Sequence, residues 1–353
     1  MSNGQWYPPE WPDRIRALAA GELTPAAPRR AATVLLLRDA TEGPHVHMLR
    51  RRTSMAFAGG AYAYPGGGVD PRDEHPVRWA GPSLESWAER LGVTGTQEAQ
   101  AIVCAAVRET FEEAGVLLAG GTADSVVDDT TGEDWEKDRE ALVARELSFA
   151  DFLDRRGLVL RSDLLGAWAR WITPEFESRR YDTWFFAAVL PAGQRTRDVS
   201  TEADRTVWIR PADAAAGYDR GELTMMPPTI STLRGLERFG TAAEALAAAQ
   251  DQDLTPVLAQ ARLEGDELIL SWPGHDEFTK HVPMSGRPGA APGPAAGTGE
   301  GAAPDATSGA DAGTGEGADA TPGPDADAGA APDATPGGTP GPDAGAPREG
   351  GAR

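Results

Sequence analysis

The sequence predicts an α/β fold in which helices cover both faces of a mixed sheet, an α/β/α sandwich. Three observations lead to this expectation: strand-like segments near the start, one long central helix, and returning strands before a late helical stretch. Residues 31–39 have the apolar run of a buried strand, and residues 44–51 alternate as a second strand would. The long helix is expected to run to residue 114, with Thr96 as its N-cap.

The other elements follow from the same periodicities and from turn residues. Helices are expected over residues 83–91, 134–147, 149–156 and roughly 229–250, and strands over residues 183–190, 207–209 and 268–272. On the long helix, the apolar positions repeat with the helical period on a face turned away from its glutamates: Ala99, Ile102, Val103, Ala106, Val107 and Phe111. This face should pack on the sheet and leave the acidic face open.

The acidic face carries the most informative residues of the chain. Glu109, Glu112 and Glu113 stand at i, i+3 and i+4, so they share one side of the helix within about one turn. Carboxylates at that spacing repel each other unless a cation lies among them, and an all-oxygen set suits Mg²⁺ or Mn²⁺ better than zinc. Arg108 can pair with Glu112 at i+4, and Gly115 is placed to end the helix. The alternative is a solvated acidic helix end.

A glycine-rich loop lies about forty residues upstream of these glutamates. Pro65 is followed by Gly66, Gly67 and Gly68, a run that stops regular structure and lets the backbone come close to a ligand or a metal. Taken alone, such a triplet is more often a turn than a site. Its combination with the acidic helix gives it meaning.

Together the two segments resemble the Nudix hydrolase family, whose box reads G-x5-E-x7-R-E-U-x-E-E-x-G-U, where U is apolar. Residues 108–116 match the second half of the box, with Thr110 in an apolar slot. The resemblance implies a Nudix-type α/β/α sandwich. It also implies that Glu109, Glu112 and Glu113 hold Mg²⁺ or Mn²⁺, with the Gly67 carbonyl as a further ligand. Arg108, Glu109 and Glu112 would then be the catalytic residues, Arg108 acting by orienting Glu112.

The first half of the box departs from the family. Gln100 stands where the box has its first glutamate, and Thr94 where it has its glycine. Gly68-x5-Glu74 satisfies the opening spacing, which makes residues 70–98 an insertion within the box. A split box is similar to that of the branch that includes the coenzyme A diphosphatases. The fourth acidic group stays open at this point, and the candidates are Asp73, Glu74 and Glu98.

Substrate-binding residues are expected before the glycine loop. Alternation along the strand would put Arg50 and Arg52 on one face, where they could hold a phosphate, although a solvated strand edge fits equally well. Tyr64 belongs to a Gly60-x3-Tyr64-Pro65-Gly66-Gly67 segment resembling that of coenzyme A-cleaving members, in which a phenylalanine replaces this tyrosine. The arginine of their motif falls on Ala56, so the match is partial.

Two further candidates come from later in the chain. Tyr181 or Trp184 could stack on an adenine, although aromatic residues in strands are more often core residues. Glu202, on a loop before a strand, is a candidate general base, and its alternative is a solvated carboxylate.

Composition divides the chain into three parts: an N-terminal extension over residues 1–29, a Nudix domain over 30–284 and a tail over 285–353. The tail has no aromatic residue and ten acidic against three basic residues, so we expect it to be disordered. The net charge of −21 argues against general nucleic-acid binding. No signal peptide or membrane span is expected, and the single cysteine, Cys104, suits a buried core position in a cytoplasmic protein.

The sequence therefore predicts a metal-dependent diphosphatase. Its substrate would be a nucleoside diphosphate linked to another group, with coenzyme A or an acyl-CoA first and ADP-ribose or a dinucleotide next. The alternative from another class is a catalytically silent Nudix-fold binding module. Nothing in the sequence indicates the oligomeric state.

Overall fold

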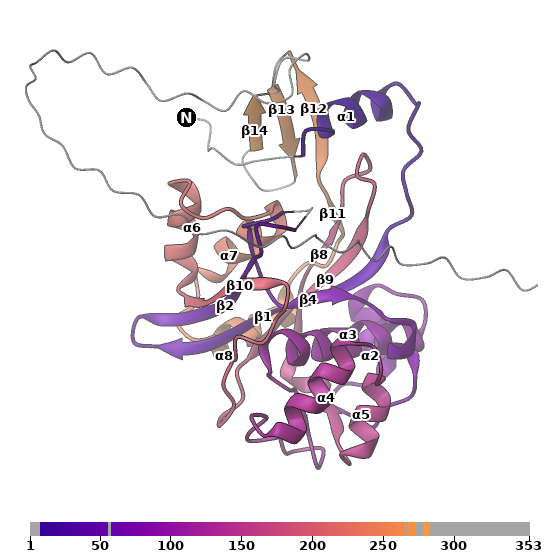
Figure 1. The fold of residues 1–353 in the computed structure, drawn as a ribbon, viewed down its shortest axis with the longest axis vertical. Helices are drawn as coiled ribbons and strands as arrows, with labels where there is room; N and C mark the ends of the chain where they lie inside the picture. The colour runs from indigo at the N-terminus through magenta and orange to yellow at the C-terminus, as the bar shows by residue number, and fades with distance from the viewer. Residues whose placement is uncertain (1–7, 56–57, 266, 273–277, 282–353) are drawn as a thin grey trace, which may run out of the picture. The chain divides into compact units, whose positions relative to one another are not determined.

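The computed structural model describes residues 8–55, 58–265, 267–272 and 278–281, so the predicted tail lies outside the described residues. The central element is a mixed sheet (Figure 1), as predicted. Its strands run in the order β10 (Ala203–Ile209), β2 (Gly43–Arg51), β1 (Arg29–Ala40), β9 (Tyr181–Val189), β8 (Leu165–Ile172) and β11 (Val257–Leu258). The β1–β9 and β8–β11 pairs are parallel, and the other pairs along this path are antiparallel.

Two short strands extend the sheet toward the glycine loop. β3 (Tyr62–Ala63) pairs with β2, and β4 (Gly66–Gly68) pairs antiparallel with β1. The register places Gly68 opposite Ala31 and Gly66 opposite Thr33. The glycine loop is therefore held at the edge of the first strand rather than left as a free turn.

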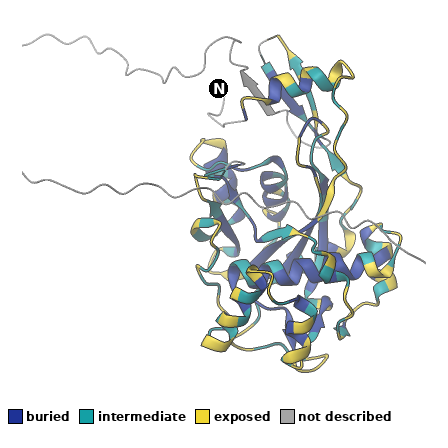
Figure 2. Cartoon of the chain, turned by 45° about the vertical axis from the view of Figure 1, so that its right-hand side comes forward, coloured by how far each residue is buried: buried dark blue, intermediate teal, exposed yellow. Residues whose placement is uncertain are grey.

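Helices cover both faces of the sheet, because its strands are apolar on both sides. On β1, Ala32, Val34 and Leu36 belong to one core cluster, while Leu35 and Leu37 belong to the other. The first cluster includes side chains of α2 (Leu84–Leu91), α3 (Thr96–Ala114), α4 (Glu133–Val143) and α5 (Phe149–Arg155). The second includes side chains of α1 (Trp11–Ala19), α6 (Pro211–Asp219), α7 (Pro227–Leu236) and α8 (Ala242–Ala248). Figure 2 shows the strands buried between these layers, whose outer sides are exposed.

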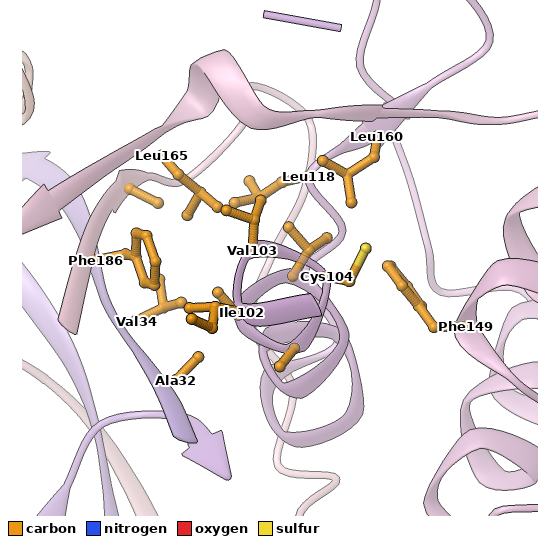
Figure 3. Close-up of a cluster of buried hydrophobic side chains, with 14 of the residues drawn as sticks. Ala32, Val34, Ile102, Val103, Cys104, Leu118, Phe149, Leu160, Leu165 and Phe186 are labelled. Carbon is orange, nitrogen blue, oxygen red and sulfur yellow. The ribbon is translucent and has the colours of Figure 1, made fainter. Parts of the chain in front are cut away.

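The central helix α3 is the most deeply buried of the helices. Ile102 and Val103 pack between the paired β1 and β9 strands and neighbouring leucines (Figure 3). Cys104 lies on the side of the helix that faces Phe149. Burial raises the pKa of the Cys104 thiol well above its ordinary value, which confirms the expectation of a small core residue. The predicted N-cap is one residue off. Gly95 is the N-cap, in extended conformation, and Thr96 is already the first helical residue.

The box insertion is part of the folded core. It contains the 3-10 turn η1 (Pro71–Glu74), β5 (Trp79–Ala80) and α2, which Ser83 caps by accepting a hydrogen bond from the Ser86 amide. β5 pairs with β7 (Val159–Arg161), and β7 also pairs with β6 (Ala119–Gly120) in a small separate sheet. A further 3-10 turn, η2 (Ser162–Leu164), leads from β7 into β8.

The late part of the chain differs from the prediction in three ways. The stretch expected as one helix over 229–250 is split into α7 and α8, because Thr241 and Glu244 form a capping box that starts a new helix. α6 was not predicted. The strand expected at 268–272 exists as β13 (Glu267–Ser271), but it pairs with β12 (Gln260–Glu264) and β14 (Phe278–His281) in a separate sheet. The 3-10 turn η3 (Ala249–Asp251) follows α8.

The N-terminal segment contributes one helix to the second core cluster. Trp11 of α1 meets the Phe176 ring edge-on at 5.1 Å between centroids, and Arg14 donates to the Phe176 carbonyl at 2.6 Å. In the described ranges, none of the helices combines the length and the apolar character that crossing a membrane requires.

Candidate active site

The C-terminal end of α3 lies beside the glycine strand β4. Both elements rest on β1, since α3 packs against it and β4 pairs with it. Tertiary structure thereby brings together residues 66–68 and residues 108–113, which are about forty positions apart in the chain. The three glutamates predicted on one face of the helix line the same cleft, together with Arg108.

Arg108 is buried and uses all five of its N–H groups in this cleft. Nε and Nη2 donate to the two carboxylate oxygens of Asp73, both at 3.0 Å, and Nη2 also donates to the Gly68 carbonyl at 2.9 Å. Nη1 donates to Glu109 at 2.7 Å and to Glu112 at 3.1 Å. The predicted Arg108–Glu112 pair is therefore present. The guanidinium also orients Glu109 and ties the helix to the glycine strand.

Of the three acids that could complete the interrupted box, Asp73 is the one that contacts Arg108. It is 2% exposed, and its carboxylate also accepts a hydrogen bond from the Asp70 amide at 2.9 Å. The other two candidates lie outside the network, because Glu98 and Glu74 pair instead with Arg30 at 2.8 and 3.9 Å. Counting from Gly67 rather than Gly68 gives Gly67-x5-Asp73, a signal that was available in the sequence.

Gln100, which stands where the family has glutamate, has a structural role next to Asp73. Its side-chain amide donates to the carbonyls of Asp73 and His75, at 3.4 and 2.8 Å. It therefore fixes the turn that carries Asp73 onto the flank of α3. Gln100, which departs from the box, therefore supports Asp73, the acid beside Arg108.

The glycines are required by the approach of the carboxylates. The Gly66 amide donates to Glu113 at 2.9 Å. A methyl group added at Gly67 would lie 2.6 Å from the Glu109 carboxyl carbon, closer than side chains come to each other. Glu109 thus packs directly over the Gly67 backbone, a position that any larger residue would deny it.

The cluster carries more negative charge than Arg108 can balance. Burial raises the pKa of Glu113 to about 8, and the neighbouring Glu109 charge adds to the effect. Burial likewise raises the pKa of Glu109 to about 7, against the opposing pull of Arg108, and it raises the pKa of Glu112. Carboxylates that resist ionisation at neutral pH would be stabilised by a further cation.

The donor chemistry fits a hard divalent ion. Over the part of the chain that the structure describes, no three acidic, histidine or cysteine side chains already converge as a metal-binding group. The Glu109 and Glu112 oxygens instead share Arg108 Nη1, and Glu113 accepts from Gly66. The three glutamates and the Gly67 carbonyl remain the predicted ligands, and all of them offer the oxygen atoms that Mg²⁺ and Mn²⁺ prefer.

A second set of contacts holds the end of α3 from the other side. Arg139 of α4 donates to the Glu112 carbonyl at 2.8 Å and pairs with Glu136, which also binds Arg197 at 2.5 Å. Gly115 ends the helix with φ of 70°, as predicted, and a methyl group there would meet the Arg197 guanidinium at 2.6 Å. The catalytic end of α3 is therefore fixed through its backbone as well as its side chains.

The cleft has a volume of about 1380 Å³, and none of the three predicted substrate-binding residues lines it. Tyr64 is a core residue. Its hydroxyl, held between the Thr229 carbonyl at 3.1 Å and the Thr232 hydroxyl at 3.0 Å, lies under α7. Arg50 pairs with Asp204 at 2.6 Å and does not line the cleft.

Arg52, the third predicted residue, is exposed and also lies outside the cleft lining, whereas Arg51 lines the cleft. Side chains alternate along β2, so Arg51 points away from Arg50. The predicted alternation therefore brings Arg51, rather than Arg50 or Arg52, to the cleft. Arg51 lies 3.7 Å from Glu202, which also lines the cleft and raises the pKa of Glu113 through its charge.

The two aromatic candidates separate clearly. Trp184 is 1% exposed and donates from its indole nitrogen to the Leu91 carbonyl at 3.0 Å, so it is a core residue. Tyr181 is 40% exposed and lines the cleft. Six further arginines, to which the sequence patterns assign no role, line the cleft: Arg29, Arg30, Arg72, Arg139, Arg145 and Arg179. Arg29 and Arg30 directly precede a predicted strand, which is the one sequence signal for this pair.

Gly67→Ala is expected to lower turnover about 100-fold, because the added methyl group must displace the Glu109 carboxylate. Stability should change little, since a flexible side chain can move aside. Gly68→Ala is the matched control, with nothing within 4 Å of the added atom. Steady-state kinetics and thermal melts of both variants test this. Equal activities would show that Glu109 need not lie over Gly67.

The chain is similar to known Nudix proteins. The sequence model of the NUDT19 Nudix domain matches residues 82–236, which include α3. The chain is 24% identical over 286 residues to the acyl-coenzyme A diphosphatase NUDT19 of Xenopus laevis, covering 70% of this chain and 74% of that protein. It is 27% identical over 269 residues to the acyl-coenzyme A diphosphatase NUDT19 of Gallus gallus, covering 60% and 69%. The crystal structure of a NUDIX hydrolase from Alicyclobacillus acidocaldarius matches with a TM-score of 0.54 and 27% identity, covering 65% of this chain and 99% of that one.

Proposed function

This chain is a Nudix hydrolase related to the acyl-coenzyme A diphosphatases, and we propose that it hydrolyses the diphosphate bond of coenzyme A or an acyl-CoA with Mg²⁺ or Mn²⁺. The observation that carries the proposal is the cluster around Arg108, where buried carboxylates outnumber the cation beside a glycine strand in an open cleft. A diphosphate brings negative charge to this cluster, and only a bound cation makes the two compatible.

The bound ion would lower the pKa of a coordinated water and neutralise charge developing on the phosphoryl oxygens. The protein's own part is positional. Arg108 holds Glu109 and Glu112 in fixed rotamers, and Asp73 holds Arg108. Because every N–H of the guanidinium is used, rotation of either carboxylate would break a hydrogen bond. The proposed ligands are therefore arranged before substrate arrives.

Two further residues have proposed roles. Arg51 lines the cleft and could pair with a substrate phosphate, which would release Glu202, 3.7 Å away. Glu202 is the proposed general base, since its side chain is 59% exposed in the cleft and is close enough to affect the pKa of Glu113. The exposed side chain of Glu202 is open to a water molecule in the cleft, whereas the Glu113 carboxylate is occupied by its hydrogen bond from the Gly66 amide.

The cellular setting is part of the proposal. The single cysteine is buried and no disulfide is required, which supports a reducing compartment such as the cytoplasm. The net charge of −21 supports a small anionic substrate bound through local arginines rather than nucleic acid bound through a general positive field.

The test is product analysis by mass spectrometry after incubation with Mg²⁺ or Mn²⁺ and a panel of coenzyme A, acetyl-CoA, ADP-ribose, NADH and a nucleoside triphosphate. Release of adenosine 3′,5′-bisphosphate with phosphopantetheine is expected. Release of AMP from the other diphosphates, with coenzyme A intact, would instead make the protein a dinucleotide or ADP-ribose diphosphatase. In the same assay Glu202→Gln should lower kcat and leave KM near wild type. An unchanged kcat would remove Glu202 as the base.

A further inference from the structure

We propose that the end of the cleft where β1 and β9 begin binds the nucleotide half of the substrate, with Tyr181 stacking on the base and Arg29 and Arg179 binding a phosphate monoester on its ribose. This inference rests on the proposed function, because it assigns a specificity site within the same cleft. It concerns recognition at a distance from the bond that is cleaved, and none of these three residues contacts the carboxylate cluster.

The sheet register places Arg29 beside Tyr181, and Arg179 lies two residues before Tyr181 in the chain. β1 and β9 are parallel, and Arg29 is directly paired with Tyr181. Paired residues of neighbouring strands project to the same face of a sheet. Both residues line the cleft, as does Thr183 two positions further along β9. Trp184, the next residue along β9 after Thr183, points to the opposite face and into the core.

Arg29 and Arg179 are cations without an assigned role in the fold. Both are exposed and line the cleft, and among the described residues neither forms an ion pair. Neighbouring arginines are engaged: Arg180 donates to the Thr173 and Ala26 carbonyls, and Arg170 pairs with Asp182 on the other face. In a chain of net charge −21, two exposed arginines that form no ion pair among the described residues, and that line the cleft with an exposed aromatic ring, favour an anionic ligand.

The acidic groups nearby do not cancel this positive end. Arg30, next in the chain, already neutralises Glu98 at 2.8 Å and approaches Glu74. Glu177 lines the cleft but is buried, with Trp11 as its hydrogen-bond donor and the Arg14 charge close by.

Tyr181 has the exposure of a binding surface rather than of a core residue. In the described part of the chain, it and Val143 are the large hydrophobic side chains that are clearly exposed, and both line the cleft. An aromatic face left open next to cations suits a purine, which stacks on the ring while its phosphate reaches the guanidinium groups. A neutral, flexible part of a substrate would contact the Tyr181 ring but would not pair with the guanidinium groups of Arg29 and Arg179.

The spacing along β1 fits one nucleotide. Gly67, over which Glu109 packs, is paired with Ala32, three residues beyond Arg29. At about 3.3 Å per residue, the two positions are roughly 10 Å apart along the strand. A diphosphate at the carboxylate cluster would therefore place its nucleoside near Tyr181. A ligand with a second, ribose-bound phosphate would use Arg29 and Arg179, and one without it would not.

Calorimetric binding of adenosine 3′,5′-bisphosphate and of AMP to the full chain tests this inference. The ligands share the base and the 5′-phosphate, so their difference isolates the second phosphate. The wild type should prefer the bisphosphate by about tenfold or more, the loss expected for a charge-assisted hydrogen bond. Arg29→Gln combined with Arg179→Gln should remove that preference, and Tyr181→Ala should weaken both ligands to a similar extent.

Arg205→Gln is the matched control, an exposed arginine on β10 outside the cleft lining, and it should bind like the wild type. Equal wild-type affinities for the two ligands, or a preference that survives the double substitution, would overturn the inference. The assay involves no turnover, so the two proposals can fail separately. Bisphosphate preference without coenzyme A cleavage would retain this site and reject the proposed reaction, and cleavage without preference would do the reverse.

Discussion

Glu113→Gln is expected to abolish turnover and, at the same time, to stabilise the metal-free protein. Glu113 is a proposed metal ligand, so its loss should reduce kcat/KM by at least about 100-fold. The same carboxylate is unfavourable in the empty site, where burial and the Glu109 charge raise its pKa to about 8. The neutral amide keeps an acceptor for the Gly66 amide and removes the charge.

The effect of pH follows from the direction of this shift. A carboxyl group whose folded pKa is raised binds protons more tightly in the native state than in the unfolded chain. The contribution of Glu113 to stability is therefore highest at low pH and falls as pH rises from about 4.5 toward 8. At pH 7 the charge costs up to about 3 kcal/mol, of which the substitution should recover about 1–2 kcal/mol after the amide's own burial cost.

Melts of the wild type and Glu113→Gln, in a chelator and across pH 5 to 8.5, measure this prediction. The gap between the two melting temperatures should widen with pH, and Mg²⁺ should stabilise the wild type far more than the variant. Glu89→Gln, at an exposed position on α2, is the matched control and should follow the wild type. If Glu113→Gln lowered the stability of the metal-free protein at pH 8, the carboxylate would not be the strained group described here.

Arg108→Met is expected to destabilise the protein by about 3–5 kcal/mol and to remove activity. The methionine fills similar space but leaves Asp73 buried without a counter-charge and frees Glu109 and Glu112 to repel each other. Breaking one side of a buried ion pair costs this much because the other charge stays in a medium that cannot solvate it.

Chemical denaturation gives the free energy of unfolding directly. Arg72→Met is the control, since Arg72 pairs with Asp70 on the same turn but is a third exposed, and it should cost no more than about 1 kcal/mol. Adding Asp73→Asn to Arg108→Met should restore part of the lost stability, because it removes the stranded charge. Additive losses in the double variant would mean that the two side chains do not act as a pair.

Local sequence was sufficient to predict the acidic end of the central helix. Spacings of three and four residues on a helix place side chains together whatever the rest of the chain does, so the shared face of Glu109, Glu112 and Glu113 and the pairing of Arg108 with Glu112 follow from residues 108–113 alone. The helix end at Gly115 and the strands β1 and β2 could likewise be predicted from local sequence.

The expectations that failed depended on which face of a strand meets the cleft. Strand alternation separates Arg50 from Arg51, but only the pairing of β2 with β10 and β3 decides that Arg51 enters the cleft. Tyr64 precedes the glycine strand in sequence, yet α7, more than 160 residues later, covers it and makes it a core residue.

The sequence by itself determined the helix with its four charged residues, the mixed sheet and the resemblance to a hydrolase family, because each rests on spacings within a few turns or strands. Only the tertiary structure decided which of the candidate acids lies beside Arg108. Asp73 and Glu74 are neighbours in the chain, but one turn of 3-10 helix directs Asp73 onto Arg108 and leaves Glu74 beside Arg30. Composition and spacing cannot distinguish two acids that are neighbours in the chain. Burial next to a guanidinium does distinguish the two carboxylates, by several kcal/mol, which is roughly the cost of a buried charge without a partner.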